Sequence, residues 1–183
     1  LVNKKNPNLS MAQVKQTFIK STAGYCVATY CMGIGDRHNG NIMLTKSGNL
    51  FHIDFGHFLG NFKKKMGFER ERSPFVFTPE MAYVIGGANY AASADYKAFQ
   101  DLCCRAYNIL RSNGDLFITL FRAMKLAGMP ELTCDDDIKY LREQLNFSFT
   151  EQQASKDFRK QITACVLEKW RRWDNAIHNM IHG

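Results

Sequence analysis

The chain has 183 residues, of which 45% are hydrophobic and 13% aromatic, and its formal net charge is +7. This composition is that of a globular domain with a sizeable core and excludes a disordered chain. It contains no apolar run of about 18 residues, which excludes a membrane-spanning helix, and its charge favours an anionic partner: nucleic acid, phosphate or an acidic membrane surface.

Cysteine usage indicates a reducing compartment. The six cysteines form no Cys-x-x-Cys pair and share no recurrent spacing, and most lie in apolar segments, where a thiol packs as a small hydrophobe. We therefore expect reduced thiols and a cytoplasmic protein. The six are Cys26, Cys31, Cys103, Cys104, Cys134 and Cys165.

The first predicted element is a long helix. Residues 1–8 are polar and read as a linker, and Ser10 with Gln13 then has the pattern of a capping box. Apolar residues follow at helical spacing over some 20 residues. This helix leads directly into the most polar stretch of the chain.

That stretch, Gly33-Ile-Gly-Asp-Arg-His-Asn-Gly-Asn41, precedes two short apolar runs, 42–44 and 50–53, which are separated by the turn-like residues 45–49. The pattern predicts a β-hairpin. Because a hairpin returns the chain to its starting point, we expect Asn41 and Asp54 to lie close together.

The remainder reads as helices. Residues 56–77 have no apolar period and are expected to form a long loop, of the length that is usually functional or disordered. Helices are predicted from Thr78 to Gly86, from Asp95 to Asn113, over 116–127, after Thr133, and over about 150–181. We therefore predict a single domain over residues 1–183, mainly α with one small β-hairpin.

The spacing of polar residues is that of a phosphoryl-transfer site. In protein kinases an Asp lies five residues before a metal-binding Asn, and a later Asp-Phe-Gly supplies the second metal carboxylate. Here Asp36 precedes Asn41 by five residues, and Asp54-Phe-Gly56 follows. The order Asp-Arg-His, which inverts the His-Arg-Asp of protein kinases, resembles the lipid kinases and related large kinases.

The string from Phe55 to Phe75 narrows the resemblance to class I phosphoinositide 3-kinase catalytic subunits. The resemblance implies the C-terminal lobe of a protein-kinase-like (α+β) fold, with residues 33–41 as catalytic loop, 54–77 as activation loop and the N-terminal lobe missing. It further implies transfer of phosphate from ATP to the inositol 3-hydroxyl, converting phosphatidylinositol 4,5-bisphosphate to the 3,4,5-trisphosphate. Expected partners are an adaptor subunit, a Ras-type GTPase and the inner face of the plasma membrane, with no nucleic acid. Without its N-terminal lobe the fragment is expected to be inactive.

Asn41 and Asp54 are the predicted Mg²⁺ ligands, because this ion prefers oxygen ligands from one or two side chains plus phosphates and water. A turn Asn and a helix-capping Asp are the alternative interpretation.

For the base that deprotonates the inositol hydroxyl, His38 and Asp36 compete. We favour His38, as base or transition-state partner, with Asp36 orienting it or the substrate. Arg37 is expected to pair with a carboxylate near the loop or to reach phosphate.

Two cationic segments are predicted to contact lipid. The resemblance makes the activation-loop cations the readers of the two ring phosphates, since Arg and Lys bind phosphate well; an ordinary solvated loop is the alternative. These cations are Lys63, Lys64, Lys65, Arg70 and Arg72. Near the end of the chain Trp170, Arg171, Arg172 and Trp173 suit a membrane interface or, equally, packing on the lobe.

Two alternative functions remain for the chain: a serine protein kinase of the same superfamily, or a non-catalytic fragment that binds acidic membranes.

Overall fold

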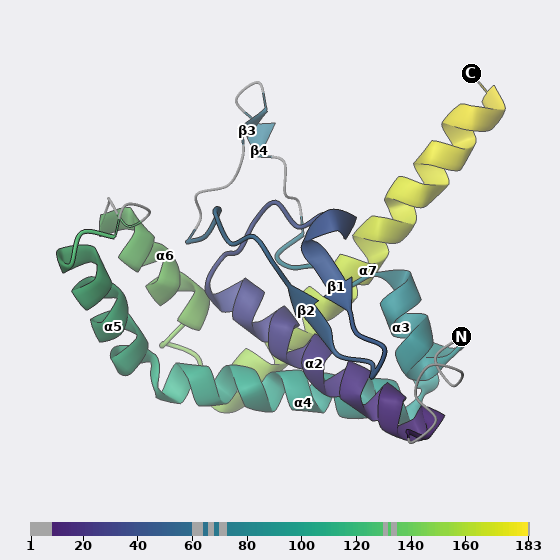
Figure 1. Ribbon diagram of the computed structural model, residues 1–183, viewed down its shortest axis with the longest axis horizontal. Coiled ribbons are helices and arrows are strands. Elements are labelled where there is room, and N and C mark those ends of the chain that lie inside the picture. Colours follow the sequence, from purple (N-terminus) through teal and green to yellow (C-terminus); the bar gives the residue numbers. More distant parts are fainter. Residues whose placement is uncertain are drawn as a thin grey trace.

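The computed structural model describes residues 9–59, 64–65, 68–69, 73–129, 132 and 135–182 (Figure 1). Of residues 64, 65, 68, 69, 135 and 169–182 only the backbone is described. The helices are α2 (Met11–Cys31), α3 (Pro79–Gly86), α4 (Ala94–Ser112), α5 (Gly114–Leu126), α6 (Asp135–Leu145) and α7 (Glu151–His182), with 3-10 turns η1 (Asn39–Asn41) and η2 (Tyr90–Ala92). The strands are β1 (Ile42–Leu44), β2 (Leu50–His52), β3 (Lys64–Lys65) and β4 (Phe68–Glu69).

Helix α2 is the central element, and its start is set locally. The Ser10 hydroxyl accepts a hydrogen bond from the Gln13 amide, and the Gln13 side chain accepts one from the Ser10 amide, which completes the predicted capping box. One side of the helix packs on α4 and the other carries the β1–β2 hairpin. The predicted catalytic loop, residues 33–41, thus begins where a buried helix ends.

The β1–β2 hairpin is antiparallel, and its register pairs Ile42 with His52 and Leu44 with Leu50. Strand β2 lies against α2, where the Leu50 amide donates to the Ser21 hydroxyl at 2.9 Å. Leu50 and His52 are buried on this inner face, whereas Phe51 points the other way. The hairpin therefore has one face fixed to the helix and one face open.

The core lies where α2, α4 and α7 meet, and aromatic rings dominate it. Phe158 of α7 stacks on Phe75 at 5.5 Å and meets the ring of Tyr30 edge-on at 5.2 Å. A second group joins Phe77 to Phe99 at 4.8 Å. Because these rings come from three helices and from the segment before α3, they tie the end of the activation loop to the helical body.

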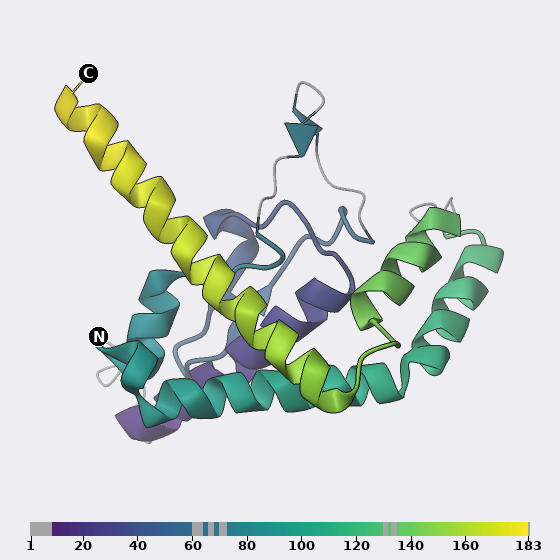
Figure 2. The ribbon, with the colours of Figure 1, turned by 180° about the vertical axis from the view of Figure 1, so that it is seen from behind.

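The outer helices extend from this core. Figures 1 and 2 show α5 and α6 as a pair to one side of the molecule, while the C-terminal half of α7 extends beyond the body. The β3–β4 hairpin projects toward the same side as that end of α7. Within the described residues, every helix is too short or too polar to cross a bilayer.

The predicted fold class is confirmed: a mainly helical chain with a small antiparallel hairpin. The helix starts at Thr78 and Thr150 are also confirmed, since both hydroxyls accept from backbone amides. The predicted long loop differs, because its middle pairs as β3 and β4. Helix α5, predicted to begin at residue 116, begins at Gly114, where the Phe147 ring occupies the space a side chain would need.

Candidate functional site

The predicted catalytic loop begins just after α2 at Gly33, a position where the structure requires a glycine. Gly33 has φ +54°, in the left-handed region that favours glycine, and a Cβ there would collide with the Tyr140 ring of α6. The loop then runs beside the segment after Asp-Phe-Gly. The Gly35 amide donates to the His57 carbonyl at 2.9 Å, and the Leu59 amide donates to the Met32 carbonyl at 2.7 Å. These two bonds hold the ends of the site together.

Asn41 and Asp54 are brought together by the pairing of the hairpin. The Ile53 amide donates to the Asn41 carbonyl at 3.0 Å, so that Asp54 follows the residue bonded directly to Asn41. The side-chain Nδ2 of Asn41 donates to the backbone carbonyl of Asp36 at 3.0 Å. This bond leaves the side-chain Oδ1 of Asn41 for another partner. Asn41 is buried, whereas Asp54 is exposed. Among the residues described, no three His, Cys, Asp or Glu side chains cluster around a possible metal position.

Arg37 fastens the catalytic loop to the Asp-Phe-Gly segment. Its guanidinium donates to the carbonyls of Gly35 at 2.8 Å and Ile53 at 2.6 Å, and also to the carbonyl of Asp54. The same group lies over the Phe55 ring, 5.6 Å from its centroid. The predicted pairing of Arg37 with a carboxylate or phosphate stays a prediction beside these contacts.

Asp36 and Asp54 both adopt backbone conformations that are unusual for non-glycine residues. Their φ angles are 56° and 60°, within the left-handed region. Such a conformation costs of order 1–3 kcal/mol and persists only where the surroundings hold it. At Asp54 the Arg37 contact to the carbonyl and the preceding strand bond supply that restraint. The strain thus falls on two of the predicted site residues.

His38 is exposed, and its ring caps the turn that follows it. Its Nδ1 accepts a hydrogen bond from the Gly40 amide at 3.1 Å. A neutral imidazole whose Nδ1 accepts a hydrogen bond carries its proton on Nε2. In this arrangement Nε2 is the ring nitrogen that is left to face a substrate.

His52 is a residue that sequence reasoning missed. Its ring is 5% exposed and stacks on Tyr25 of α2, with centroids 4.8 Å apart and planes 17° from parallel. Its Nδ1 is buried without a hydrogen-bond partner. Burial, and secondarily the nearby Arg37 charge, lower the pKa of His52 from 6.5 to about 4. A neutral, buried ring therefore lies two residues before Asp54.

Sequence reasoning also missed an apolar face beside the site. Residues directly opposite each other in the hairpin share a face, so Met43, Phe51 and Ile53 lie on the side away from α2. Met43 is 43% exposed and Ile53 37% exposed, although both are large hydrophobic residues. Side chains of a strand alternate between two faces, so the sequence could have indicated this outer face once Leu50 and His52 were recognised as buried.

The predicted lipid-contacting residues fall largely beyond what is described. Lys63, Arg70 and Arg72 lie outside the described residues, and only the backbone of Lys64 and Lys65, paired with Glu69 and Phe68, is described. Trp170, Arg171, Arg172 and Trp173 continue the backbone of α7, and their side chains are likewise outside the description. Their roles stay predictions.

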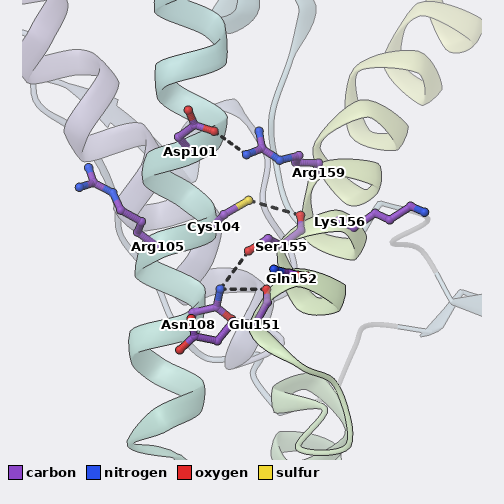
Figure 3. A pocket seen from close by; sticks show the side chains of 9 residues that line it. All are labelled: Asp101, Cys104, Arg105, Asn108, Glu151, Gln152, Ser155, Lys156 and Arg159. Atoms are coloured by element: carbon purple, nitrogen blue, oxygen red, sulfur yellow. Dashed lines mark hydrogen bonds and ion pairs between the residues drawn. The ribbon is translucent and has the colours of Figure 1, made fainter.

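A groove of about 670 Å³ lies on the other side of the molecule, between α4 and α7 (Figure 3). Its polar groups bridge the two helices: Arg159 pairs with Asp101, the Asn108 amide donates to the Ser155 hydroxyl at 2.9 Å, and the Cys104 thiol faces the Ser155 carbonyl. No predicted site residue lines this groove. We therefore place the candidate site at the catalytic loop and the hairpin.

Comparison with known proteins gives consistent matches. Residues 1–134 match the family described as phosphatidylinositol 3- and 4-kinase. The chain is 52% identical to phosphatidylinositol 3-kinase 2 of Dictyostelium discoideum over 167 residues, which cover 91% of this chain and 9% of that protein. It is 51% identical to phosphatidylinositol 3-kinase 1 over 166 residues (91% and 10%) and 48% identical to phosphatidylinositol 3-kinase 3 over 182 residues (100% and 10%), both of the same organism. The chain thus spans about a tenth of the length of these curated relatives.

Proposed function

Because the chain belongs to the phosphatidylinositol 3- and 4-kinase family, we propose that it is the C-terminal lobe of a phosphoinositide 3-kinase catalytic domain. The reaction would transfer the γ-phosphoryl group of ATP to the 3-hydroxyl of an inositol lipid. One observation carries the proposal: the bond from the Ile53 amide to the Asn41 carbonyl places Asn41 beside the start of Asp54-Phe-Gly56. The two residues then lie at the same end of the hairpin.

The donor set fits Mg²⁺. Asp54 offers an exposed carboxylate, and Asn41 offers an amide oxygen because its nitrogen is committed to the Asp36 carbonyl. A hard cation of this size takes one or two such side chains together with phosphate oxygens. When bound, the ion would neutralise charge on the terminal phosphates.

The hydrogen bond at Nδ1 of His38 favours a division of roles in the loop. Because Nδ1 accepts a hydrogen bond from the Gly40 amide, the ring would donate a hydrogen bond from Nε2 to the phosphoryl group as it is transferred. Asp36, five residues before Asn41, then has the position from which a carboxylate accepts the proton of the attacking hydroxyl. We therefore assign the base to Asp36, and the proton-donating role to His38.

The apolar face of the hairpin would receive the nucleotide base. Met43, Phe51 and Ile53 form a surface continuous with Asn41 and Asp54 along the two strands. Ligand sites combine such apolar walls with a few polar groups that fix orientation. ATP held against this face would direct its phosphates toward Asp54.

The finer substrate and partners belong to the same proposal. We assign the enzyme to class I, with phosphatidylinositol 4,5-bisphosphate as acceptor, held by the cations Lys63 to Lys65, Arg70 and Arg72. Resemblance to class I enzymes also supports an adaptor subunit, a Ras-type GTPase and recruitment from the cytoplasm to the plasma membrane. Kinases hold the nucleotide's α- and β-phosphates with an N-terminal lobe, so we propose that activity requires such a lobe together with this chain.

The test uses the full-length protein that contains this chain. Asp54→Asn should reduce phosphorylation of phosphatidylinositol 4,5-bisphosphate by at least about a hundredfold, comparable to loss of a group that stabilises transition-state charge. Asp115→Asn, which changes an exposed carboxylate on α5, should leave the rate unchanged. Lipid product is measured by chromatography, and folding of both variants by circular dichroism.

Three results would contradict the proposal. Full activity of a folded Asp54→Asn protein would remove the metal site. Phosphorylation of a serine peptide in place of lipid by the wild type would favour the protein-kinase alternative. Equal rates on phosphatidylinositol and on its 4,5-bisphosphate would remove the class I assignment while leaving the lipid-kinase assignment intact.

A further inference from the structure

We propose that His52 is a positioning residue, whose ring stacks on Tyr25 and so fastens strand β2 to α2 and sets the place of Asp54. His52 itself would touch neither ATP nor lipid. The proposal rests on the proposed function for its catalytic consequence, whereas its structural part stands without it.

The first step is the match between helix and strand. Ser21 and Tyr25 lie one turn apart on α2, a rise of about 6 Å. Leu50 and His52 lie two residues apart on β2, about 6.6 Å. Two contacts therefore form in register: the Leu50 amide donates to the Ser21 hydroxyl at 2.9 Å, and the His52 ring stacks on Tyr25 at 4.8 Å.

The second step is the short sequence separation between His52 and Asp54. Regular strand pairing ends at His52, and the next residue bonds once more to Asn41. Asp54 then turns into the left-handed region, with φ 60°. A strand that shifted on α2 would carry this carboxylate with it, because only Ile53 intervenes.

The third step concerns what the His52 ring contributes. Its Nδ1 is buried without a partner, an arrangement that hydrogen bonding does not explain. The contact the ring does make is flat stacking, which a phenyl ring reproduces. We therefore assign the role to the aromatic plane, and a Phe should replace it.

The structural test is amide hydrogen exchange of the chain, followed at the Ile53 amide by nuclear magnetic resonance. His52→Ala should speed exchange at Ile53 about tenfold, since the strand loses its aromatic contact with α2. His52→Phe should restore the wild-type rate. Tyr25→Leu removes the stack from the helix side and should reproduce the effect of His52→Ala, which covers the case in which that variant fails to fold. Tyr83→Ala, at an exposed residue of α3, is the matched control.

The catalytic test uses the full-length protein. His52→Ala should lower kcat about tenfold and raise the Mg²⁺ concentration needed for half the maximal rate, with the lipid KM unchanged, and His52→Phe should restore both values. The proposal is overturned if His52→Ala leaves exchange at Ile53 unchanged, or if His52→Phe is as defective as His52→Ala. An inactive wild type with the expected exchange pattern would instead count against the proposed function alone.

Discussion

At the scale of single residues, Arg37 decides how the two halves of the site meet. Its guanidinium joins the carbonyl of Gly35 in the catalytic loop to the carbonyls of Ile53 and Asp54 after the hairpin. Three acceptors in different directions suit the planar fork of arginine and not the single ammonium of lysine. The residue therefore acts on the position of Asp54.

Replacing Arg37 by Lys should separate this role from phosphate binding. Loss of charge-assisted bonds, each worth about 1.5–3 kcal/mol, should lower kcat at least about tenfold while the KM for ATP stays unchanged. Steady-state kinetics of the full-length protein measure both values. An increase in the KM for ATP with kcat preserved would indicate instead that Arg37 contacts phosphate, and Arg122→Lys on the exposed face of α5 is the control.

His52 should make the stability of the fold depend on pH. Its folded pKa of about 4 lies below the ordinary 6.5, so between these values the unfolded chain binds a proton that the folded chain does not. Stability should therefore be full above pH 6.5 and fall on acidification toward pH 4, by at most about 1.4 kcal/mol for each pH unit. Urea unfolding at pH 5 and pH 7 measures the difference, which His52→Phe should diminish; an equal pH dependence in both proteins would contradict the assignment.

At the scale of elements, a buried arginine ties α4 to the connection between α6 and α7. Arg111 donates to the carbonyls of Leu145, Asn146 and Phe149, and it also bonds the Asn108 side chain. These carbonyls lie at the end of α6 and in the turn after it, where intrahelical donors are lacking. The Arg111 side chain thus supplies hydrogen-bond donors to three backbone carbonyls in this connection.

Arg111→Met should destabilise the chain by about 3 kcal/mol, because several acceptors lose a charged donor at once. The free energy of urea unfolding is the measurement. Arg105→Met changes an exposed arginine on the same helix and should stay within about 0.5 kcal/mol of wild type. Similar losses for both variants would mean that the carbonyls find water instead.

At the scale of the whole molecule, the aromatic cluster around Phe158 holds the helices and the end of the activation loop together. This ring contacts Tyr30 of α2, Tyr107 of α4 and Phe75 of the segment before α3, and it is fully buried. The catalytic loop and the activation loop are therefore both attached to elements that meet at one point in the core.

Phe158→Ala should lower the free energy of unfolding by about 3–5 kcal/mol, since it leaves a cavity among rings from three helices. Leu167→Ala, at a half-exposed leucine of the same helix, should cost about 1 kcal/mol or less. Denaturant unfolding of the two variants makes the comparison. Equal losses would show that the cluster repacks around the missing ring.

Local features of the sequence were sufficient for the helices and the β1–β2 hairpin, but not for the pairing of β3 with β4. The helix starts at Ser10, Thr78 and Thr150 depend on hydroxyls and amides no more than three residues apart, and the hairpin depends on two apolar runs around a turn. The proximity of Asn41 and Asp54 followed from the hairpin alone. Among the described residues, five cysteines are buried and form no disulfide, as their apolar surroundings indicated, while Cys134 lies outside the described residues.

Only the tertiary structure decided what these elements touch. The Arg37 contacts cross 16 and 17 residues, the stack of His52 on Tyr25 crosses 27, and the Phe158 cluster joins segments more than 50 residues apart. Such contacts depend on how α2, the hairpin and α7 pack, which no spacing within one segment encodes. The sequence by itself therefore predicted which side chains are candidates for the chemistry, because the spacing of polar residues is a local property. Packing determined how these side chains are held, because their contacts come from distant segments.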